Sequence, residues 1–337
     1  MEHLDENQLI ELVEQRVTVE ARARIQRHLD TCEGCREMLG FVASASPSLG
    51  PTEVDLSRHL RASALAPGEV LGGRFTLERE VGEGGMGVVW AARDEAGAPV
   101  AVKILKEVSA AERRRFQREA RLMQSFDHPG ILDVREVVAV GDEGDVFLVM
   151  DLLAGESLGG RLGRVGRLTV EETVGVARPL VDALAVAHAR GVVHRDVKPE
   201  NVFLCTGGRV VLLDFGMAKL TGALDLAVSG WMTESGLILG TPHYMAPEQI
   251  YGERDVDARA DVWSLGVVLY ECLTGERPVS GKSFGQLVRA LQRREIADLS
   301  SRRADVPSAF AELVRSMLSI DRAERPTLGT VARALAP

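Results

Sequence analysis

Two kinds of sequence pattern follow one another along this chain, and their order limits the folds that it can adopt. Short runs typical of β-strands come first: FTLEREV, GVVWAAR, PVAVKIL and DVFLVMDLL. After Glu156, longer stretches with helical periodicity dominate. This order predicts an α+β fold with a small sheet-rich lobe at about residues 74–150 and a larger helical lobe at about 151–335. The sequence contains no internal repeat, which excludes solenoids and propellers.

The first 73 residues differ in character from the rest. Residues 1–42 carry apolar side chains at helical spacing between charged ones, which predicts a module of two or three short helices. Residues 43–73 contain SASPSLGPTE and ALAPGEVLGG, where Ser, Pro and Gly interrupt any periodicity. We therefore expect a helical module at 1–42, a linker at 43–73 and one larger domain at 74–335.

Composition excludes several classes of protein. The 337 residues include 40 Lys and Arg against 49 Asp and Glu, a formal net charge of −9, which argues against nucleic-acid binding. Four cysteines are too few for a secreted disulfide scaffold, and the start MEHLDENQ lacks the features of a signal peptide. No stretch of about 18 uncharged apolar residues occurs. We expect a soluble cytoplasmic protein without membrane or nucleic-acid partners.

Three glycines, Gly82, Gly84 and Gly87, stand between two of the β-like runs. Glycines at this spacing let backbone N–H groups approach phosphates without obstruction by Cβ atoms. In a dinucleotide-binding Rossmann unit such a loop leads into a helix, whereas here it joins strand to strand, which excludes that fold. Alone, the spacing is weak evidence for phosphate binding.

One lysine interrupts the apolar strand at 99–105. The alternation of the strand directs Lys103 inward, and a buried ammonium group needs partners. The charged helix expected next offers Glu119 for an ion pair, with Glu112 as the alternative.

Three further motifs occur in order: HRDVKPEN at 194–201, VLLDFG at 211–216 and GTPHYMAPE at 240–248. With the glycine loop and Lys103, they resemble the motifs of eukaryotic-like protein kinases, and specifically those of bacterial Ser/Thr kinases of that superfamily. The resemblance covers about residues 74–335. It implies the bilobal protein kinase fold and transfer of the γ-phosphate of ATP to Ser or Thr hydroxyls of proteins.

The resemblance assigns roles to residues in both lobes. Lys103, fixed by Glu119, would hold the α- and β-phosphates of ATP. Asp214 would bind Mg²⁺ or Mn²⁺, and Asn201 would supply an amide oxygen to a second metal position. The resemblance also implies a set of ATP-binding residues, which lie in the glycine loop, on strands beyond it and at a gatekeeper position beside the adenine pocket. They are Val81, Gly82, Glu83, Gly84, Gly85, Met86, Gly87, Val88, Val89, Ala101, Lys103 and Met150.

Two more roles fall within the first of these motifs. The resemblance implies that Asp196 accepts the proton of the substrate hydroxyl or orients that hydroxyl. Lys198 would place a cation near the transferring phosphoryl group, a pattern typical of Ser/Thr kinases, which Thr241 also suits. Related kinases imply autophosphorylation shortly before Thr241, at Thr233 and Ser235.

Other positions resemble structural residues of the family. Asp261 in DVWSLG resembles a helix aspartate that braces the catalytic loop, and Arg325 resembles an arginine that pairs with Glu248. Cys205 and Cys272 fall within apolar segments, so we expect both in the core.

A separate group of residues lies in the N-terminal module. His28, Cys32 and Cys35 are spaced so that their side chains can converge at a helix end, and thiolate and imidazole suit tetrahedral Zn²⁺. The surrounding sequence resembles the small zinc module of bacterial anti-sigma factors. That resemblance implies a fourth ligand about 25 residues upstream, where His3 stands. A redox CxxC pair, or a zinc site completed by water or a partner, is the alternative.

These patterns together predict an active cytoplasmic Ser/Thr protein kinase in bacterial signal transduction, with protein substrates. Its zinc module would regulate the kinase or dock a partner. Two other hypotheses stay open. One is a pseudokinase scaffold, which is disfavoured because all the expected residues are present: Lys103, Glu119, Asp196, Asn201 and Asp214. The other is a transcription-control protein whose N-terminal module binds a sigma factor.

Overall fold

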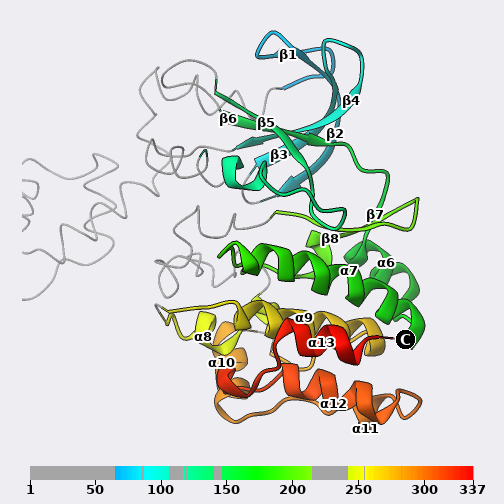
Figure 1. Cartoon of the computed structure of the whole chain (residues 1–337), viewed down its shortest axis with the longest axis vertical. Coiled ribbons are helices and arrows are strands. Elements are labelled where there is room, and N and C mark those ends of the chain that lie inside the picture. Colours follow the sequence, from blue (N-terminus) through cyan, green and yellow to red (C-terminus); the bar gives the residue numbers. More distant parts are fainter. Residues whose placement is uncertain are drawn as a thin grey trace, which may run out of the picture. The chain divides into compact units, whose positions relative to one another are not determined.

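The computed structural model describes residues 65–84, 87–105, 117, 120–139, 146–214, 242–253, 255–281 and 283–336. Residues 65–337 form one unit of the structure (Figure 1). Several expectations fall outside the described residues: the helical module at 1–42 and most of the linker, His3, His28, Cys32 and Cys35, Gly85 and Met86, Glu112 and Glu119, and Thr233, Ser235 and Thr241.

An antiparallel sheet makes the first lobe, and in the described residues it has six strands in the order β1-β2-β3-β4-β6-β5. All four runs predicted as strands are confirmed. The sequence patterns did not single out β5, an edge strand whose VREVVA segment is short and carries two charges. The strands are β1 (Val70–Leu71), β2 (Phe75–Gly84), β3 (Gly87–Arg93), β4 (Pro99–Leu105), β5 (Val134–Ala139) and β6 (Val146–Asp151).

Alternation along β4 divides its side chains between the two faces of the sheet. Val100, Val102 and Ile104 are buried in an apolar cluster with side chains of β2, β3 and β6. Ala101 and Lys103 lie on the opposite face, where Ala101 joins a cluster that continues into the second lobe. The predicted inward orientation of Lys103 is confirmed, because only 6% of its surface is exposed.

Helices and a small sheet in the order β7-β8-β9 make the second lobe (Figure 1). The HRDVKPEN motif ends where β8 begins, and Asp214 comes two residues after β9. The elements are β7 (Gly155–Ser157), α6 (Leu158–Val165), α7 (Val170–Ala189), the short 3₁₀ helix η1 (Pro199–Asn201), β8 (Val202–Cys205), β9 (Val210–Leu212), η3 (Pro242–Tyr244), α8 (Pro247–Ile250), α9 (Arg259–Thr274), α10 (Phe284–Gln292), α11 (Leu299–Arg302), α12 (Ser308–Met317), η4 (Arg322–Glu324) and α13 (Leu328–Ala334).

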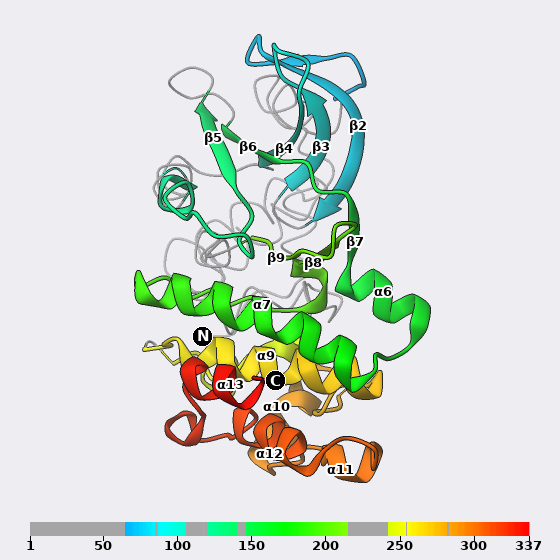
Figure 2. The ribbon, with the colours of Figure 1, turned by 45° about the vertical axis from the view of Figure 1, so that its right-hand side comes forward.

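Helix α9 lies in the middle of this lobe, with α7 on one side and α12 on the other (Figure 2). Nearly all of its residues are buried, as expected for a helix that is apolar on every side. Helix α7 begins with a capping box, in which the side chains of Thr169 and Glu172 each accept a hydrogen bond from the backbone N–H of the other. These two helices form the base from which the loops of the candidate site extend.

The two described cysteines differ in burial. Cys272 on α9 is fully buried, as predicted, and burial raises the pKa of its thiol. Cys205 on β8 is only half-buried, so its prediction as a core residue is wrong. Its cross-strand neighbour is Gly155, which has no side chain to cover it. Among the described helices, none combines the length and the apolar character needed to cross a membrane.

Candidate active site

The glycine loop joins β2 to β3, as its position between two β-like runs predicts. Gly84 pairs with Gly87 at the end of this hairpin, while Gly85 and Met86 lie outside the described residues. Gly87 leaves no room for a side chain, because a Cβ atom there would lie 2.1 Å from the backbone oxygen of Ile104 on β4. The close approach of β3 to β4 therefore requires this glycine.

The register of the sheet brings together predicted ATP-binding side chains from three strands. Val89 on β3 lies opposite Lys103 on β4, and Ala101 lies opposite Met150 on β6. Because Ala101 and Lys103 are two residues apart, these four side chains share one face of the sheet. The side chain of Val88 packs into the apolar cluster on the opposite face.

Three more of the predicted residues, Val81, Gly82 and Glu83, are exposed near the end of β2. Val81 has 47% of its surface exposed, an unusual fraction for a large apolar side chain on a strand. No described atom lies within 4 Å of the position that a Cβ atom of Gly82 would take. This end of the hairpin is therefore open to a ligand.

An ion pair joins the two lobes. Lys103 Nζ on β4 donates a hydrogen bond to Asp214 Oδ1 at 2.6 Å. Desolvation favours the protonated carboxyl, but the Lys103 ammonium, with smaller contributions from His194 and Lys198, outweighs it and holds the pKa of Asp214 below its ordinary value. Glu119, the expected partner of Lys103, lies outside the described residues, and within them Lys103 pairs with Asp214.

Two residues of the site have a left-handed backbone, which residues other than glycine rarely adopt. Arg195 has a φ of 68°, and Asp214 has a φ of 55°. Such a conformation costs roughly 1–3 kcal/mol and persists only where surrounding contacts hold it. At Arg195 the contacts are a hydrogen bond from its N–H to Asp261 and one from the Gln249 side chain to its carbonyl oxygen. The sequence patterns did not assign a role to Gln249.

Asp261, fully buried on α9, braces the HRDVKPEN motif as predicted. Its Oδ2 accepts hydrogen bonds from the backbone N–H of His194 at 2.8 Å and from Nε2 of His188 at 2.7 Å. Its Oδ1 accepts the N–H of Arg195 at 2.7 Å. His188, near the end of α7, was missed at the sequence level because its partner is distant in sequence.

His194 connects the HRDVKPEN motif to the segment before Asp214. The N–H of Asp196 donates to His194 Nδ1 at 3.2 Å, so the ring proton is on Nε2, which donates to the backbone oxygen of Leu213 at 2.8 Å. The N–H of Leu213 in turn donates to the backbone oxygen of Asn201 at 2.8 Å. These bonds position Asp196 and Asp214 relative to each other.

The Asp196 carboxylate is oriented by two residues of its own motif. Lys198 Nζ donates to Asp196 Oδ2 at 2.6 Å, and Asn201 Nδ2 donates to the same oxygen at 2.9 Å. Asp196 Oδ1 has no hydrogen-bond partner among the described residues. One carboxylate oxygen is thus held in place while the other is available to a substrate hydroxyl.

Asn201 and Asp214 could hold a divalent cation. Asn201 uses only Nδ2 in its side-chain hydrogen bonds, and Asp214 uses only Oδ1, which leaves one oxygen of each without a partner among the described residues. Mg²⁺ is commonly held by one or two protein oxygens together with nucleotide phosphates and water, so the pair fits this ion. No group of three or more His, Cys, Asp or Glu side chains that could hold a metal occurs in the described part of the chain.

A second ion pair anchors the segment that contains α8. Arg325 donates to both carboxylate oxygens of Glu248, at 2.6 and 2.8 Å, and both side chains are buried. The Arg325 guanidinium also lies over the ring of Trp263, 5.2 Å from its centroid. The predicted pairing of Arg325 with Glu248 is confirmed.

The arrangement suits phosphoryl transfer. That reaction needs in-line positioning and neutralisation of phosphate charge, with little covalent help from the protein. The site offers an oriented carboxylate with one available oxygen, two lysines and a pair of oxygen ligands.

Known proteins resemble this chain in sequence and in structure. The family model described as "Protein kinase domain" matches residues 75–335. Serine/threonine-protein kinase PknA of Mycobacterium tuberculosis is 38% identical over 268 residues, which are 77% of this chain and 59% of PknA. Serine/threonine-protein kinase PkaB of Streptomyces coelicolor is 40% identical over 230 residues, 65% of this chain and 53% of PkaB. The chain thus spans little more than half the length of these relatives.

A solved structure also matches. It is the crystal structure of Rad53 1–466 in complex with AMP-PNP, with a TM-score of 0.63 and 26% sequence identity. The match covers 78% of this chain and 64% of the Rad53 chain. It therefore extends over both lobes of the described fold.

Proposed function

Because this chain belongs to the protein kinase family, with a domain of the kind found in bacterial serine/threonine kinases, we propose that the whole protein is an ATP-dependent Ser/Thr protein kinase in bacterial signal transduction. The observation that carries the proposal is the Asp196 carboxylate, which has one oxygen oriented by Lys198 and Asn201 and one oxygen available. A pseudokinase scaffold would have no need of this arrangement.

ATP lies, in this proposal, against the sheet face that contains Val89, Ala101 and Met150. Their apolar side chains shield the adenine from water, and the exposed end of the β2–β3 hairpin covers the phosphates. Lys103, on the same face, neutralises charge on the α- and β-phosphates.

Lys103 and Asp214 pair with each other in the structure, so nucleotide binding exchanges their partners. Lys103 turns to the phosphates, and the Asp214 carboxylate becomes free to ligate a cation together with Asn201 Oδ1. A bound Mg²⁺ ion would neutralise charge on the β- and γ-phosphate oxygens.

Asp196 acts on the second substrate, a Ser or Thr side chain of a protein. Its Oδ1 accepts a hydrogen bond from the hydroxyl and orients the hydroxyl oxygen toward the γ-phosphorus. As the new P–O bond forms and the bond to ADP breaks, the hydroxyl proton passes to the carboxylate. Lys198 holds Oδ2 and compensates charge beside the transferring group.

The test is a phosphorylation assay on the purified protein with labelled ATP and casein, followed by mass spectrometry of the modified residues. We expect phosphoserine and phosphothreonine. Asp196→Asn should lower the rate by roughly 10²–10⁴-fold while nucleotide binding persists. Asp182→Asn, which makes the same change at an exposed position on α7, serves as the matched control. Nucleotide binding without phosphotransfer in the wild type would favour the scaffold instead.

Activation by autophosphorylation is a further part of the proposal. Thr233 and Ser235 precede Thr241 as regulatory hydroxyls do in related kinases, and Arg195 beside Asp196 offers a guanidinium to a phosphate of about −1.5 to −2 charge. Mass spectrometry of active protein should find phosphate at Thr233 or Ser235. Unchanged activity after Thr233→Ala with Ser235→Ala would contradict the switch.

We also propose that a zinc module at 1–42 and a linker at 43–73 precede the kinase domain at 74–335. The protein is, in this proposal, cytoplasmic. Residues within that module, His28, Cys32 and Cys35 with His3, would bind about one Zn²⁺. The module would regulate the kinase or dock a partner such as a sigma factor. Elemental analysis of the wild type beside Cys32→Ser and His3→Ala tests the site, and a pulldown with the N-terminal module tests the partner.

A further inference from the structure

Gln249 is a buried polar side chain to which the proposed mechanism gives no role. It lies on the short helix α8, and only 3% of its surface is exposed. Its amide joins two segments: Oε1 accepts a hydrogen bond from the backbone N–H of Ala246 at 3.0 Å, and Nε2 donates to the backbone oxygen of Arg195 at 3.0 Å. Buried amides that are paired at both ends make the segments that they join rigid.

The two contacts need an amide at this position. The N–H of Ala246 requires an acceptor and the carbonyl oxygen of Arg195 requires a donor, and the end of a glutamine side chain supplies one of each. An ionised carboxylate would supply two acceptors and no donor, and an apolar side chain would supply neither. The structure therefore uses both halves of the Gln249 side-chain amide.

Helix α8 is a fixed support for this side chain. Glu248, the residue before Gln249, forms the buried ion pair with Arg325. The backbone N–H of Gln249 itself donates to the backbone oxygen of Ala246 at 2.9 Å. The amide of Gln249 is thus held by its own helix and can in turn hold Arg195.

The oxygen that Gln249 holds belongs to the peptide group between Arg195 and Asp196. A peptide group is planar, so its oxygen and its N–H turn together. The N–H of this group, which is that of Asp196, donates to His194 Nδ1 at 3.2 Å. On the other side of Asp196, its own carbonyl oxygen accepts a hydrogen bond from Asn201 Nδ2 at 2.8 Å. The backbone of Asp196 is therefore held on both sides, which sets the direction of its side chain.

The conformation of Arg195 depends on such contacts. Its left-handed φ of 68° is unfavourable for a residue with a Cβ atom and persists only where the surroundings hold it. Loss of the bond from Gln249 would let the peptide group before Asp196 rotate. A misplacement of about 1 Å can lower a catalysed rate by about 100-fold.

We propose that Gln249 is a positioning residue for phosphotransfer. By holding the carbonyl oxygen of Arg195 from α8, it sets the direction in which the Asp196 carboxylate meets the substrate hydroxyl. This role rests on the proposed kinase function, because it concerns the same reaction. The contacts of Gln249 go to the backbone beside Asp196, so we expect an effect on the rate of transfer and none on nucleotide binding.

Steady-state kinetics of Gln249→Met in the full chain test this role. Methionine is of similar size and adapts to the space, but it lacks the two hydrogen bonds. With labelled ATP and casein, we expect kcat to fall by roughly 10–100-fold. KM for ATP and the affinity for ADP with Mg²⁺ should change by less than about twofold. A folded variant with the kcat of the wild type would contradict the role.

The wild type separates this failure from that of the proposed function. An active wild type beside an equally active Gln249→Met removes the role of Gln249 alone. A wild type that binds ADP but transfers no phosphate to casein removes the kinase function, and the role of Gln249 with it.

A double-mutant cycle shows whether Gln249 acts through Asp196. In Asp196→Asn, the oriented carboxylate is already absent, so adding Gln249→Met should lower the remaining rate by less than about twofold. Long incubations with labelled ATP measure these low rates. The same fold-loss in both backgrounds would mean that Gln249 affects the rate by a route that does not involve Asp196, and the proposal would be wrong.

Gln249→Asn carries the test if Gln249→Met does not fold. Asparagine keeps the amide but is shorter by one CH₂ group, so it cannot reach both the N–H of Ala246 and the oxygen of Arg195. We expect kcat to fall in the same direction, with circular dichroism and ADP binding showing an intact fold. Normal kcat in this variant would show that Arg195 does not need the amide of Gln249.

Ser264→Ala is the matched control in the same region. The Ser264 hydroxyl on α9 is buried and donates to the backbone oxygen of Tyr244, in the segment just before α8, at 2.7 Å. Its loss loosens this segment without touching the peptide group before Asp196, so kcat should stay within about twofold of the wild type. A fall in kcat equal to that of Gln249→Met would attribute the effect to general loosening and refute the positioning role.

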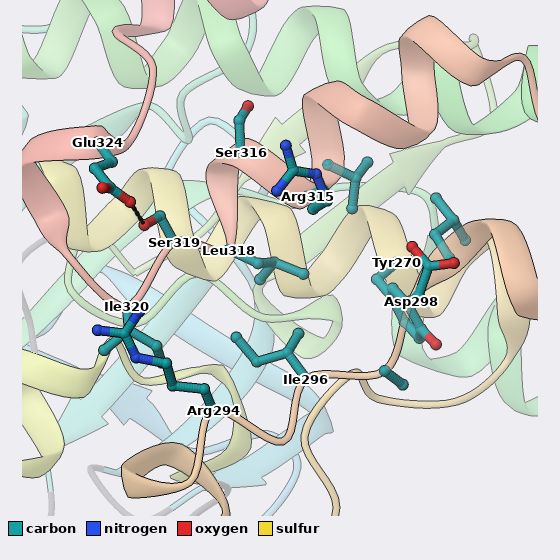
Figure 3. Close-up of a pocket in the computed structure, with 13 residues that line it drawn as sticks. Tyr270, Arg294, Ile296, Asp298, Arg315, Ser316, Leu318, Ser319, Ile320 and Glu324 are labelled. Atoms are coloured by element: carbon teal, nitrogen blue, oxygen red, sulfur yellow. Dashed lines mark hydrogen bonds between the residues drawn. The ribbon is translucent and has the colours of Figure 1, made fainter.

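A remote control comes from the other side of α9. A cavity of about 420 Å³ lies there, and its lining includes Tyr270, Ser319 and Glu324. The Ser319 hydroxyl donates to Glu324 Oε2 at 2.7 Å, as the dashed line in Figure 3 shows. Ser319→Ala removes this bond and should leave kcat within about twofold of the wild type. A loss as large as that of Gln249→Met would show that kcat responds to any lost hydrogen bond in this lobe, which would also refute the role.

Discussion

Single buried polar side chains hold the HRDVKPEN motif in its conformation. Asp261 is the main example, because one carboxylate accepts hydrogen bonds from His188, His194 and Arg195. A buried charge is tolerated when its lone pairs are occupied in this way. Removing an acceptor leaves donors unpaired in the protein interior, which costs more than the bond itself contributes.

Asp261→Asn tests this bracing. Asparagine keeps the shape but offers one acceptor oxygen, and its amide nitrogen would face an N–H donor. We expect a loss of about 2–4 kcal/mol in the free energy of unfolding and a large fall in phosphotransfer, because the left-handed Arg195 loses its support. Urea unfolding and the labelled-ATP assay measure the two effects. Asp182→Asn should change neither, and a variant at position 261 as stable as the wild type would contradict the role.

The pair of Arg303 and Asp305 gives stability a pH dependence. Arg303 is nearly buried and donates to the backbone oxygen of Leu273 at the end of α9, and its Nε and Nη2 donate to Asp305 at 2.7 and 2.8 Å. These hydrogen bonds lower the pKa of Asp305 to about 2. A carboxylate with a lowered folded-state pKa stabilises the fold above its unfolded pKa of about 4, and this contribution is lost as the pH falls toward 2.

Asp305→Asn should therefore be less stable than the wild type at pH 7, and the difference should shrink as the pH falls from about 4 toward 2. Urea midpoints of both proteins across this range measure it. Asp182→Asn again provides the control, with no such convergence expected. If the difference in urea midpoint stayed constant down to the lowest pH at which both proteins fold, the charge of Asp305 would make no contribution to stability.

At the scale of elements, the close packing of α9 against α12 depends on a glycine. A Cβ atom on Gly266 would lie 3.0 Å from the Cβ atom of Met317 and 3.2 Å from the side chain of Leu318. Carbon atoms at optimal separation are about 3.5–4.0 Å apart, so the helices would have to move. Gly175 on α7, in contrast, has no described atom within 4 Å of its Cβ position.

Replacement of glycine by alanine should thus have opposite effects on the free energy of unfolding at positions 266 and 175. Gly266→Ala is expected to destabilise the protein by about 1–3 kcal/mol, because overpacking at the interface exceeds the gain in helix propensity. Gly175→Ala is expected to stabilise it by about 0.5–1 kcal/mol. Chemical unfolding of the two variants checks both signs. Stabilisation by Gly266→Ala would mean that α9 and α12 adapt to the added methyl group at little cost.

On the scale of the whole molecule, the kinase unit contains its own apolar clusters. Both lobes of the unit at residues 65–337 contribute buried apolar side chains to these clusters, and the Lys103–Asp214 ion pair joins the two lobes within that unit. The proposed zinc module, in contrast, is too small to bury much apolar surface and would depend on its metal.

Chelation should therefore affect only the N-terminal region. We expect EDTA to remove zinc and to unfold residues 1–42, while the melting transition of the kinase unit stays unchanged. Differential scanning calorimetry of the full chain with and without EDTA tests this, with a fragment of residues 65–337 as the matched comparison. A shift of the main transition in the full chain but not in the fragment would show that the module supports the kinase unit.

Local sequence was sufficient for the parts of the protein that depend on spacing along the chain. The alternation at 99–105 predicts both the strand and the buried Lys103, and glycines between two strands predict the hairpin. The roles of Asp261 and Arg325 follow from resemblance to motifs with fixed order, and their contacts match it.

The rest depends on contacts between segments that are distant in sequence. The pairing of Lys103 with Asp214, the hydrogen bond from His188 to Asp261 and the cavity beside Tyr270 each join elements that no periodicity connects. Cys205 is half-buried because its cross-strand neighbour is a glycine, and the register between β7 and β8 determines which residue that neighbour is. Sequence determined which chemical groups this protein has and on which elements they lie. Only tertiary packing decided which of these groups come into contact, because the register of strands and the packing of helices set the distances between segments that are far apart in sequence.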